Sequence, residues 1–298
     1  MFRFLRRAGQ ITRIDITPPR PKADRAGIAV VLIVRNEETH IAEWARFHRL
    51  AGVSRFIVYD NGCTDGTLAA LRTEAPDVVI LPWAQKFRDG PREIHNQVLA
   101  YAHAVANFGA GFRWMTFIDV DEFLVPKQAA SLPQALAHLG DIPQISLPWH
   151  MFGRSGHMTP PEGGVLANYT QRNPDPMSDQ KGLRNFKMIV DPCRVTSMKV
   201  HQIWTDGSPQ SWNDRGETTK RENRAFYSAD HIQLNHYYTR SDAELRAKIA
   251  RGPNLTTPDA DHLRRVMRKV AAIEENVVLD RAALDWLVRT GKPSKISP

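Results

Sequence analysis

The sequence has few cysteines and no long apolar run. Only Cys63 and Cys193 occur in its 298 residues, so a disulfide framework is not expected and a reducing compartment is favoured. The longest uninterrupted apolar run, Ile28–Val34, has the length of a strand, whereas a membrane-spanning helix needs roughly 20 residues. No secretory leader is evident at the amino terminus. We therefore expect a soluble, cytoplasmic protein.

Two phosphate-binding signatures are also missing. The first predicted strand is followed neither by the glycine-rich fingerprint of a dinucleotide-binding fold nor by a P-loop. In those motifs, glycines let the backbone approach the phosphates closely. If this protein binds a nucleotide, a divalent cation has to neutralise the phosphate charge instead.

Positive charge is concentrated at the amino terminus. The formal net charge is +8, but residues 1–25 carry seven basic and two acidic side chains, and the remainder carries 33 basic and 30 acidic ones. Such a nearly balanced domain does not indicate nucleic-acid binding. We expect residues 1–25 to form a basic, flexible tail. This tail is either simply solvated or in peripheral contact with an anionic membrane surface at the inner face of the membrane.

The apolar pattern of the first half alternates strands and helices. Continuous apolar runs predict buried strands over residues 28–34, 56–59, 78–81 and 114–118. Periodicity and capping residues predict a helix capped by Asn36, one from residue 67 and one over residues 91–108. Alternating strands and helices form a mostly parallel sheet with helices on both faces. We predict one α/β domain over residues 26–298, with a nucleotide-binding half (26–126) and an acceptor-binding half with C-terminal helices (127–298).

Two aspartates close the last of these strands. Asp119 and Asp121 follow the apolar run, and because strand side chains alternate between faces, we expect both carboxylates on one side. Like charges this close repel each other unless a cation neutralises them, and Mg²⁺ or Mn²⁺ prefers hard oxygen ligands. Ligands of open α/β sheets bind at this carboxyl edge. The pattern predicts a metal site, and a plain acidic turn is the simpler alternative.

A further carboxylate, Asp60, ends the second predicted strand. It lies beside the place where the first strand delivers Arg35, Asn36 and Glu37. An acidic residue at such a strand end accepts a hydrogen bond from a ribose hydroxyl, which favours a nucleotide pocket. The sequence Asp60-Asn-Gly also favours a simple turn. The residues alone leave both interpretations open.

Five motifs occur in a fixed order between about residues 29 and 252: Ile33-Val-Arg-Asn-Glu37, Glu43-Trp-Ala-Arg-Phe-His48, Tyr59-Asp-Asn-Gly-Cys-Thr-Asp-Gly66, Phe117-Ile-Asp-Val-Asp-Glu-Phe123 and Asn235-His-Tyr-Tyr-Thr-Arg-Ser241. Together they resemble the GT-A glycosyltransferases of the family 2-like and family 92 groups. One departure is Cys63, where Ser is usual. The resemblance implies a GT-A fold and metal-dependent transfer of a sugar from a nucleotide-sugar donor, a uridine diphosphate sugar. The acceptor would be a glycan or a lipid-linked molecule, in the synthesis of polysaccharides or surface glycans.

The resemblance also implies roles for single residues. The donor would be bound by Arg35, Asn36, Glu37, Asp60, Asp65, Asp119 and Lys187, although Lys187 could also merely face solvent. The ion, Mn²⁺ or Mg²⁺, would be bound by Asp119, Asp121 and His236, with Asp121 as the more direct ligand. The transfer is expected to invert the configuration of the sugar.

An inverting transfer needs a base near the acceptor hydroxyl. The sequence leaves this base open between Glu162, Asp175 and Asp206. Asp206 is favoured because it follows the apolar-basic segment Val200–Trp204. Three aromatic side chains either stack on an acceptor sugar or belong to the core: Trp149, His150 and Phe152. A non-catalytic nucleotide-sugar or glycan-binding protein and a metal-dependent nucleotidyltransferase are the alternative functions.

Overall fold

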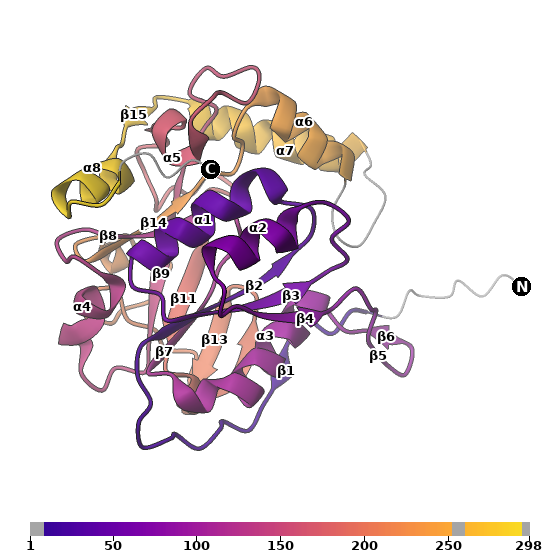
Figure 1. The fold of residues 1–298 in the computed structure, drawn as a ribbon, viewed down its shortest axis with the longest axis vertical. Coiled ribbons are helices and arrows are strands. Elements are labelled where there is room, and N and C mark those ends of the chain that lie inside the picture. Colours follow the sequence, from indigo (N-terminus) through magenta and orange to yellow (C-terminus); the bar gives the residue numbers. More distant parts are fainter. Residues whose placement is uncertain (1–8, 252–259, 294–298) are drawn as a thin grey trace, which may run out of the picture.

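A computed structural model describes residues 9–251 and 260–293, and its centre is an eight-stranded sheet (Figure 1). The strand order is β4-β3-β2-β7-β11-β9-β14-β8. The first four strands are mutually parallel: β4 (Val79–Pro82), β3 (Arg55–Asp60), β2 (Ile28–Val34) and β7 (Trp114–Phe117). The other four are β11 (Phe186–Val190), β9 (Gln144–Met151), β14 (Ile232–His236) and β8 (Glu122–Pro126).

The second half of the sheet is mixed. Strand β11 runs antiparallel to both β7 and β9, β14 is parallel to β9, and β8 is antiparallel to β14. The predicted α/β class is confirmed. The parallel strands are the predicted ones, whereas the strands beyond β7 give the sheet its mixed character.

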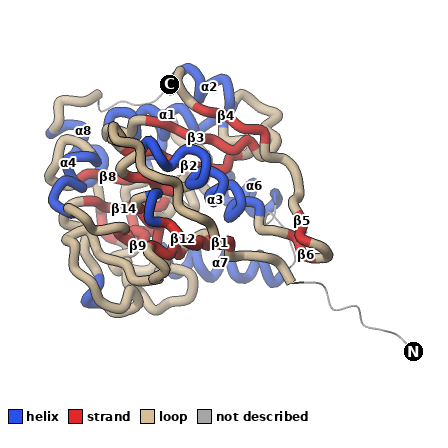
Figure 2. The backbone as a smooth tube through the Cα atoms, turned by 90° about the horizontal axis from the view of Figure 1, so that it is seen from below, coloured by secondary structure: helices blue, strands red, loops and turns tan. Residues whose placement is uncertain are grey.

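Helices cover both faces of the parallel half, as predicted. Helices α1 (Glu38–Leu50) and α2 (Thr67–Glu74) lie on one face, and α3 (Asn96–Phe108) lies on the other (Figure 2). The side chains of β2 alternate between the two cores: Val30 and Leu32 pack with Trp44 of α1, and Val31 packs with Tyr101 of α3. The continuous apolar run of β2 follows from this burial on both faces.

The remaining elements surround this sheet. A small sheet contains β1 (Ile14–Asp15), β12 (Val195–Lys199) and β13 (Gln202–Thr205). Two strand pairs are β5 (Arg88–Asp89) with β6 (Arg92–Glu93), and β10 (Gln171–Arg172) with β15 (Val278–Leu279). The other helices are α4 (Leu132–Leu136), α5 (Gly164–Asn168), α6 (Asp242–Arg251), α7 (Ala260–Glu274) and α8 (Ala282–Arg289). None of the described helices combines the length and the apolar character that crossing a bilayer requires.

Part of the predicted flexible tail packs on the domain. In β1, Ile14 and Asp15 pair with Met198 and Ser197 of β12. Further on, Arg25 donates two hydrogen bonds, of 2.5 and 2.9 Å, to the carboxylate of Asp191, which is almost fully buried. The prediction that the tail extends to residue 25 is therefore wrong for this segment. Residues 1–8 lie outside the described residues.

Two predicted helix starts are also wrong. Helix α3 begins at Asn96 and not at residue 91, because residues 88–93 form the β5–β6 hairpin around Gly90. The N-cap position of α1 is occupied by Glu37, and not by Asn36. Asn36 has a left-handed φ of 54°, and its side-chain oxygen accepts a hydrogen bond from the Thr64 N–H at 2.9 Å. The Asn36 side chain thus links two loops instead of capping the helix.

Candidate functional site

The acidic pair lies in the turn between β7 and β8. Strand β7 ends at Phe117, so Asp119 and Asp121 are not strand residues, although they follow its carboxyl end as predicted. The turn is closed by the Glu122 N–H, which donates to the Asp119 carbonyl oxygen at 3.0 Å. Glu122 itself is fully buried at the start of β8. The turn therefore adds a third carboxylate to the two that the sequence indicated.

A buried lysine neutralises two of these carboxylates. In the sheet, Ile189 of β11 pairs with Thr116 of β7, which places Lys187 level with the end of β7. The Lys187 ammonium lies 2.9 Å from Asp119 Oδ2 and 3.3 Å from Glu122 Oε2, and the side chain is 1% exposed. The alternative that Lys187 merely faces solvent is therefore wrong. Its charge compensates the acidic turn from inside the protein.

Glu122 is held by donors only. Its Oε1 accepts from the Trp149 indole N–H at 2.7 Å, and its Oε2 accepts from the Asp119 backbone N–H at 2.8 Å. Burial raises the pKa of Glu122, and Lys187 opposes this rise. Burial alone would lower the pKa of Lys187, but Asp119 and Glu122 hold that pKa well above its usual value. Because every partner of the Glu122 carboxylate is a donor, the geometry fits its ionised form.

Asp121 meets two residues from the carboxyl-terminal third of the chain. The Lys248 ammonium of α6 lies 2.8 Å from Asp121 Oδ2, and Nε2 of His236, at the end of β14, lies 3.5 Å from the same oxygen. Burial alone would raise the pKa of Asp121, but Lys248 and His236 hold it well below its usual value. Burial lowers the pKa of His236 to about 4, although Asp121 acts against this. At neutral pH an ionised carboxylate thus faces a neutral imidazole.

This pair fits a divalent cation. A carboxylate oxygen and a neutral imidazole nitrogen are both common metal ligands, and the two atoms lie close enough to bind one ion. Both oxygens of Asp119 are already engaged, because Lys187 and the Gln97 amide donate to them. Across residues 9–251 and 260–293, no three His, Cys, Asp or Glu side chains form a metal-binding group. Two of the three predicted ligands, Asp121 and His236, are brought together.

The loops that follow β2 and β3 are tied to each other. Besides the Asn36–Thr64 contact, Asp65 accepts hydrogen bonds from the Thr67 hydroxyl and N–H at 2.5 and 3.0 Å, and the Thr67 hydroxyl accepts from the Glu37 N–H at 2.8 Å. Two of the predicted donor ligands, Asn36 and Asp65, thus form these loop contacts. Arg35 is exposed at the same edge.

Asp60 ends β3 as predicted. Its Oδ1 accepts hydrogen bonds from the N–H groups of Gly62 and Cys63 at 3.1 and 2.8 Å, which is the geometry of an Asx-turn. No residue of the described part of the chain donates a hydrogen bond to its Oδ2. The turn and the nucleotide pocket are therefore compatible, because one oxygen shapes the loop and the other is accessible to a ligand.

Arg240 connects the first loop to the region after β14. Its guanidinium lies 3.2 Å from the Glu37 carboxylate, and its Nε is buried without a hydrogen-bond partner among the described residues. The Arg240 backbone has a left-handed φ of 51°, which is uncommon for a residue with a side chain. Strain of this kind often accompanies functional sites. The sequence motif that ends in Ser241 contains Arg240, but its spacing gives no hint of this contact.

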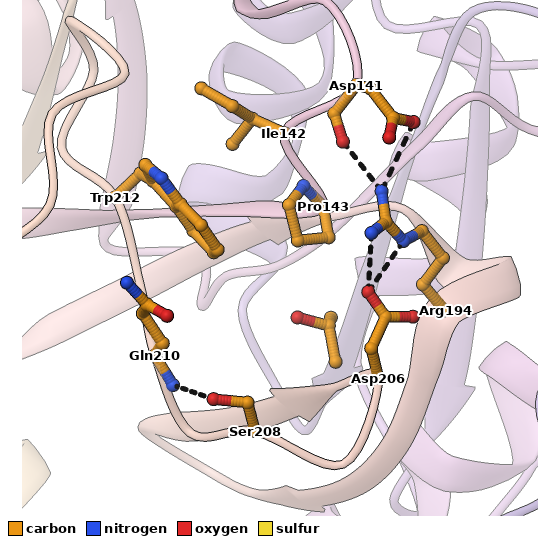
Figure 3. Close-up of a pocket in the computed structure, with 9 residues that line it drawn as sticks. Asp141, Ile142, Pro143, Arg194, Asp206, Ser208, Gln210 and Trp212 are labelled. Atoms are coloured by element: carbon orange, nitrogen blue, oxygen red, sulfur yellow. Dashed lines mark hydrogen bonds and ion pairs between the residues drawn. The ribbon is translucent and has the colours of Figure 1, made fainter.

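Asp206, the favoured base, does not belong to this cluster. It forms an ion pair with Arg194, which also binds Asp141, beside a pocket of about 460 Å³ (Figure 3). This region adjoins the end of β11, where Val190 pairs with Met115 near the amino-terminal end of β7. Asp206 therefore lies at the edge of the sheet opposite to the acidic turn, and nothing in the geometry supports its role as the base.

Of the other candidates for the base and for acceptor contacts, only Trp149 contacts the acidic turn. Asp175 forms an ion pair with Arg224, and Glu162 is exposed in a loop. Two of the aromatic candidates, His150 and Phe152, are 1% and 0% exposed, so they belong to the core. Trp149 is 7% exposed, and it touches the site through its bond to Glu122.

With this geometry established, the comparisons with known proteins identify the family. Residues 31–270 match the model of Glycosyltransferase family 92, which is most of the chain. The chain belongs to glycosyltransferase family 92. The family expected from the five motifs is therefore confirmed, and the expectation of a glycosyltransferase is confirmed at the level of the family.

The curated relatives are longer family 92 proteins. One from Oryza sativa subsp. japonica is 29% identical over 184 residues, which cover 59% of this chain and 29% of that protein. One from Arabidopsis thaliana is 26% identical over 192 residues, which cover 59% of this chain and 30% of that protein. The matched part of this family 92 chain thus spans less than a third of the length of these relatives.

Similar solved structures include two bacterial proteins. Glucosyl-3-phosphoglycerate synthase from Mycobacterium tuberculosis, in complex with Mn²⁺, uridine diphosphate and glucosyl-3-phosphoglycerate, is 22% identical with a TM-score of 0.26. The match covers 44% of this chain and 45% of that one. TarS of S. aureus is 13% identical with a TM-score of 0.35, over 82% of this chain and 43% of that one.

Proposed function

We propose that this family 92 chain moves a sugar from a uridine diphosphate sugar to a glycan or lipid-linked acceptor, with inversion and with Mn²⁺ or Mg²⁺ bound. Its role would be in the synthesis of polysaccharides or other surface glycans. Family membership supports the sugar transfer. The observation that carries the metal and the nucleotide is the Asp121–His236 pair, which lies at the same edge of the sheet as Asp60.

Each group at this edge has a distinct part in the proposed reaction. Asp121 and His236 would hold the ion, which supplies positive charge for the diphosphate of the donor. Asp60 would accept a hydrogen bond from the ribose through its Oδ2. Lys187 keeps Asp119 and Glu122 compensated, so the turn that carries Asp121 stays in place. Charge develops on the diphosphate as it leaves, and fixed positive groups there lower the barrier.

Calorimetric titration of uridine diphosphate tests the donor site. We expect binding in the presence of Mn²⁺ and a strong loss of affinity with a chelator. Asp121→Asn should remove the metal dependence, because the carboxylate that shares the ion with His236 loses its charge. Asp141→Asn is the matched control, since Asp141 is a fully exposed carboxylate at the opposite edge of the sheet.

The outcomes separate the proposal from its alternatives. Absence of binding of uridine diphosphate and of other nucleoside diphosphates to the wild type would refute the donor site. Binding without transfer from any nucleotide sugar, to acceptors or to water, would indicate a binding protein. Release of pyrophosphate from a nucleoside triphosphate would indicate a nucleotidyltransferase. Turnover of a uridine diphosphate sugar, with the anomeric configuration of the product read by NMR, would support the proposal.

A further inference from the structure

One cation beside the candidate site has no carboxylate partner. Lys269, on α7, holds its ammonium 3.8 Å from the centre of the Tyr238 ring and 5.1 Å from that of Trp149. No ion pair or hydrogen bond joins it to another of the described residues. Its side chain is only partly exposed. The Lys269 ammonium is thus held against aromatic faces and is not paired directly with a carboxylate of the described residues.

These aromatic rings contact the acidic cluster, which consists of Asp119, Asp121 and Glu122 with the side chains bound to them. The Trp149 indole donates to Glu122, and the Trp149 ring centre is 4.3 Å from that of His236. The Tyr238 ring also receives the Lys248 ammonium, which is 4.4 Å from its centre and bonded to Asp121. Lys269 is therefore separated from His236 by the Trp149 ring, and from Asp121 by Tyr238 and Lys248.

The other cations of the cluster are all paired. Lys187 faces Asp119 and Glu122, Lys248 faces Asp121, and Arg240 faces Glu37. With Lys269, four cations face the four carboxylates Asp119, Asp121, Glu122 and Glu37, and of these cations only Lys269 forms no ion pair with a described residue. Burial lowers the pKa of Lys269 to about 8, Lys248 adds to this effect, and Asp121 and Glu122 oppose it, so the ammonium carries a desolvation cost here. An anion that binds here would relieve that cost.

Helix packing fixes this arrangement. Helices α6 and α7 lie together at one end of the molecule (Figure 1), and Leu245 of α6 packs against Val266 and Val270 of α7. The turn of α7 that buries Val266 and Val270 therefore also aims Lys269 at the cluster. The next residue back, Arg268, is exposed on the same helix.

We propose that Lys269 binds the diphosphate of the nucleotide-sugar donor. This inference rests on the proposed function, and it names a donor-binding residue that the motifs do not contain. The diphosphate of the donor would lie beside the candidate ion, so the unpaired Lys269 ammonium, which reaches His236 across one ring, is placed to meet it. Tyr238 and Trp149 would keep the ammonium in position before the donor arrives, which saves ordering entropy on binding.

The test compares three variants by calorimetry with uridine diphosphate and with uridine as probes. Lys269→Met keeps an unbranched apolar stem on the aromatic rings but removes the charge. Its affinity for uridine diphosphate should fall roughly 10- to 100-fold, the range for a lost charge-assisted hydrogen bond, while its affinity for uridine stays unchanged. Lys269→Arg should restore most of the affinity. Arg268→Met removes an exposed charge from the same helix and should behave like the wild type.

Each result decides the inference. Unchanged binding of uridine diphosphate by Lys269→Met overturns it while leaving the proposed function intact. An equal loss for uridine and uridine diphosphate also overturns it, because it would show a structural role. If the wild type binds neither probe, the proposed donor site fails together with the inference. If Lys269→Met does not fold, as judged by circular dichroism, Lys269→Gln takes its place in the same comparison.

Discussion

Replacing Lys187 with Met removes the cation that holds the acidic turn together. The Lys187 side chain is 1% exposed and that of Glu122 is 0% exposed, so neither can exchange its partner for water. Removing one member of a buried ion pair costs about 3–5 kcal/mol, because the other charge stays buried without compensation. At roughly 2–4 °C per kcal/mol for a chain of this order of length, the melting temperature should fall by roughly 6–20 °C.

The loss should depend on pH in a defined direction. Without Lys187, the pKa of Glu122 in the folded state rises further above its value in the unfolded chain, since burial already raises it. A group with a raised pKa binds more protons in the folded state, so its penalty shrinks as the pH falls. The free energy of unfolding of Lys187→Met should therefore approach that of the wild type as the pH falls to about 8, the folded-state pKa of Glu122 in the wild type.

Urea unfolding followed by tryptophan fluorescence measures both effects. Lys220→Met is the matched control, because Lys220 is exposed and its loss should change the free energy of unfolding by less than about 0.5 kcal/mol. A loss below about 1 kcal/mol for Lys187→Met at about pH 9 would refute the reasoning. It would show that water or a rearranged side chain compensates Asp119 and Glu122 as well as Lys187 does.

Three further outcomes follow from the same structure. Burial lowers the pKa of His48 to about 3 from about 6.5 in the unfolded chain, so its stabilisation is complete above pH 6.5 and is lost on acidification. In urea titrations between pH 6.5 and 4.5, His48→Gln should reduce the slope of the free energy of unfolding against pH by about 1.4 kcal/mol per pH unit. An unchanged slope would contradict the burial of His48. Asp206→Asn should leave sugar transfer within about twofold in an assay of released uridine diphosphate, and a large loss would restore Asp206 as the base. Asp191→Asn should cost about 3 kcal/mol and speed proteolysis before residue 26, because Asp191 binds Arg25 and Arg113; resistance equal to that of the wild type would contradict this.

The parallel half of the fold could be predicted because its signals are local. The run Ile28–Val34 is buried on both faces, so it reads as a strand from composition alone. Asp60 and the pair at residues 119 and 121 follow strands of this half, and parallel strands place their carboxyl ends at one edge. Local patterns also explain the errors there: Gly90 allows a hairpin at positions where the apolar period alone suggested helix.

Apart from His236, the partners of the acidic pair could not be predicted, because they depend on the register of distant strands. Lys187 meets Asp119 only since β11 runs antiparallel to β7 with Ile189 opposite Thr116. Lys248 and Lys269 arrive on helices whose position is set by packing between α6 and α7. In the sequence, Lys269 falls on the basic face of its helix, opposite the apolar positions, which is typical of a solvated face. His236 was found only through its motif, and its approach to Asp121 follows from the β14–β8 pairing.

The charges of the cluster suggest how the ion and the donor depend on each other. Asp121 is already compensated by Lys248, so a divalent ion that binds alone competes with an ammonium for the same oxygen. A diphosphate that binds alone would meet Lys269, as proposed, but also the ionised Asp121. When both are present, the ion would replace Lys248 at Asp121, and the diphosphate would pair with the released ammonium. The ion would also neutralise Asp121, whose charge otherwise repels the diphosphate, so that each ligand favours binding of the other. Thermodynamic linkage is reciprocal: if the bound ion raises the affinity for the donor by some factor, the bound donor should raise the affinity for the ion by the same factor.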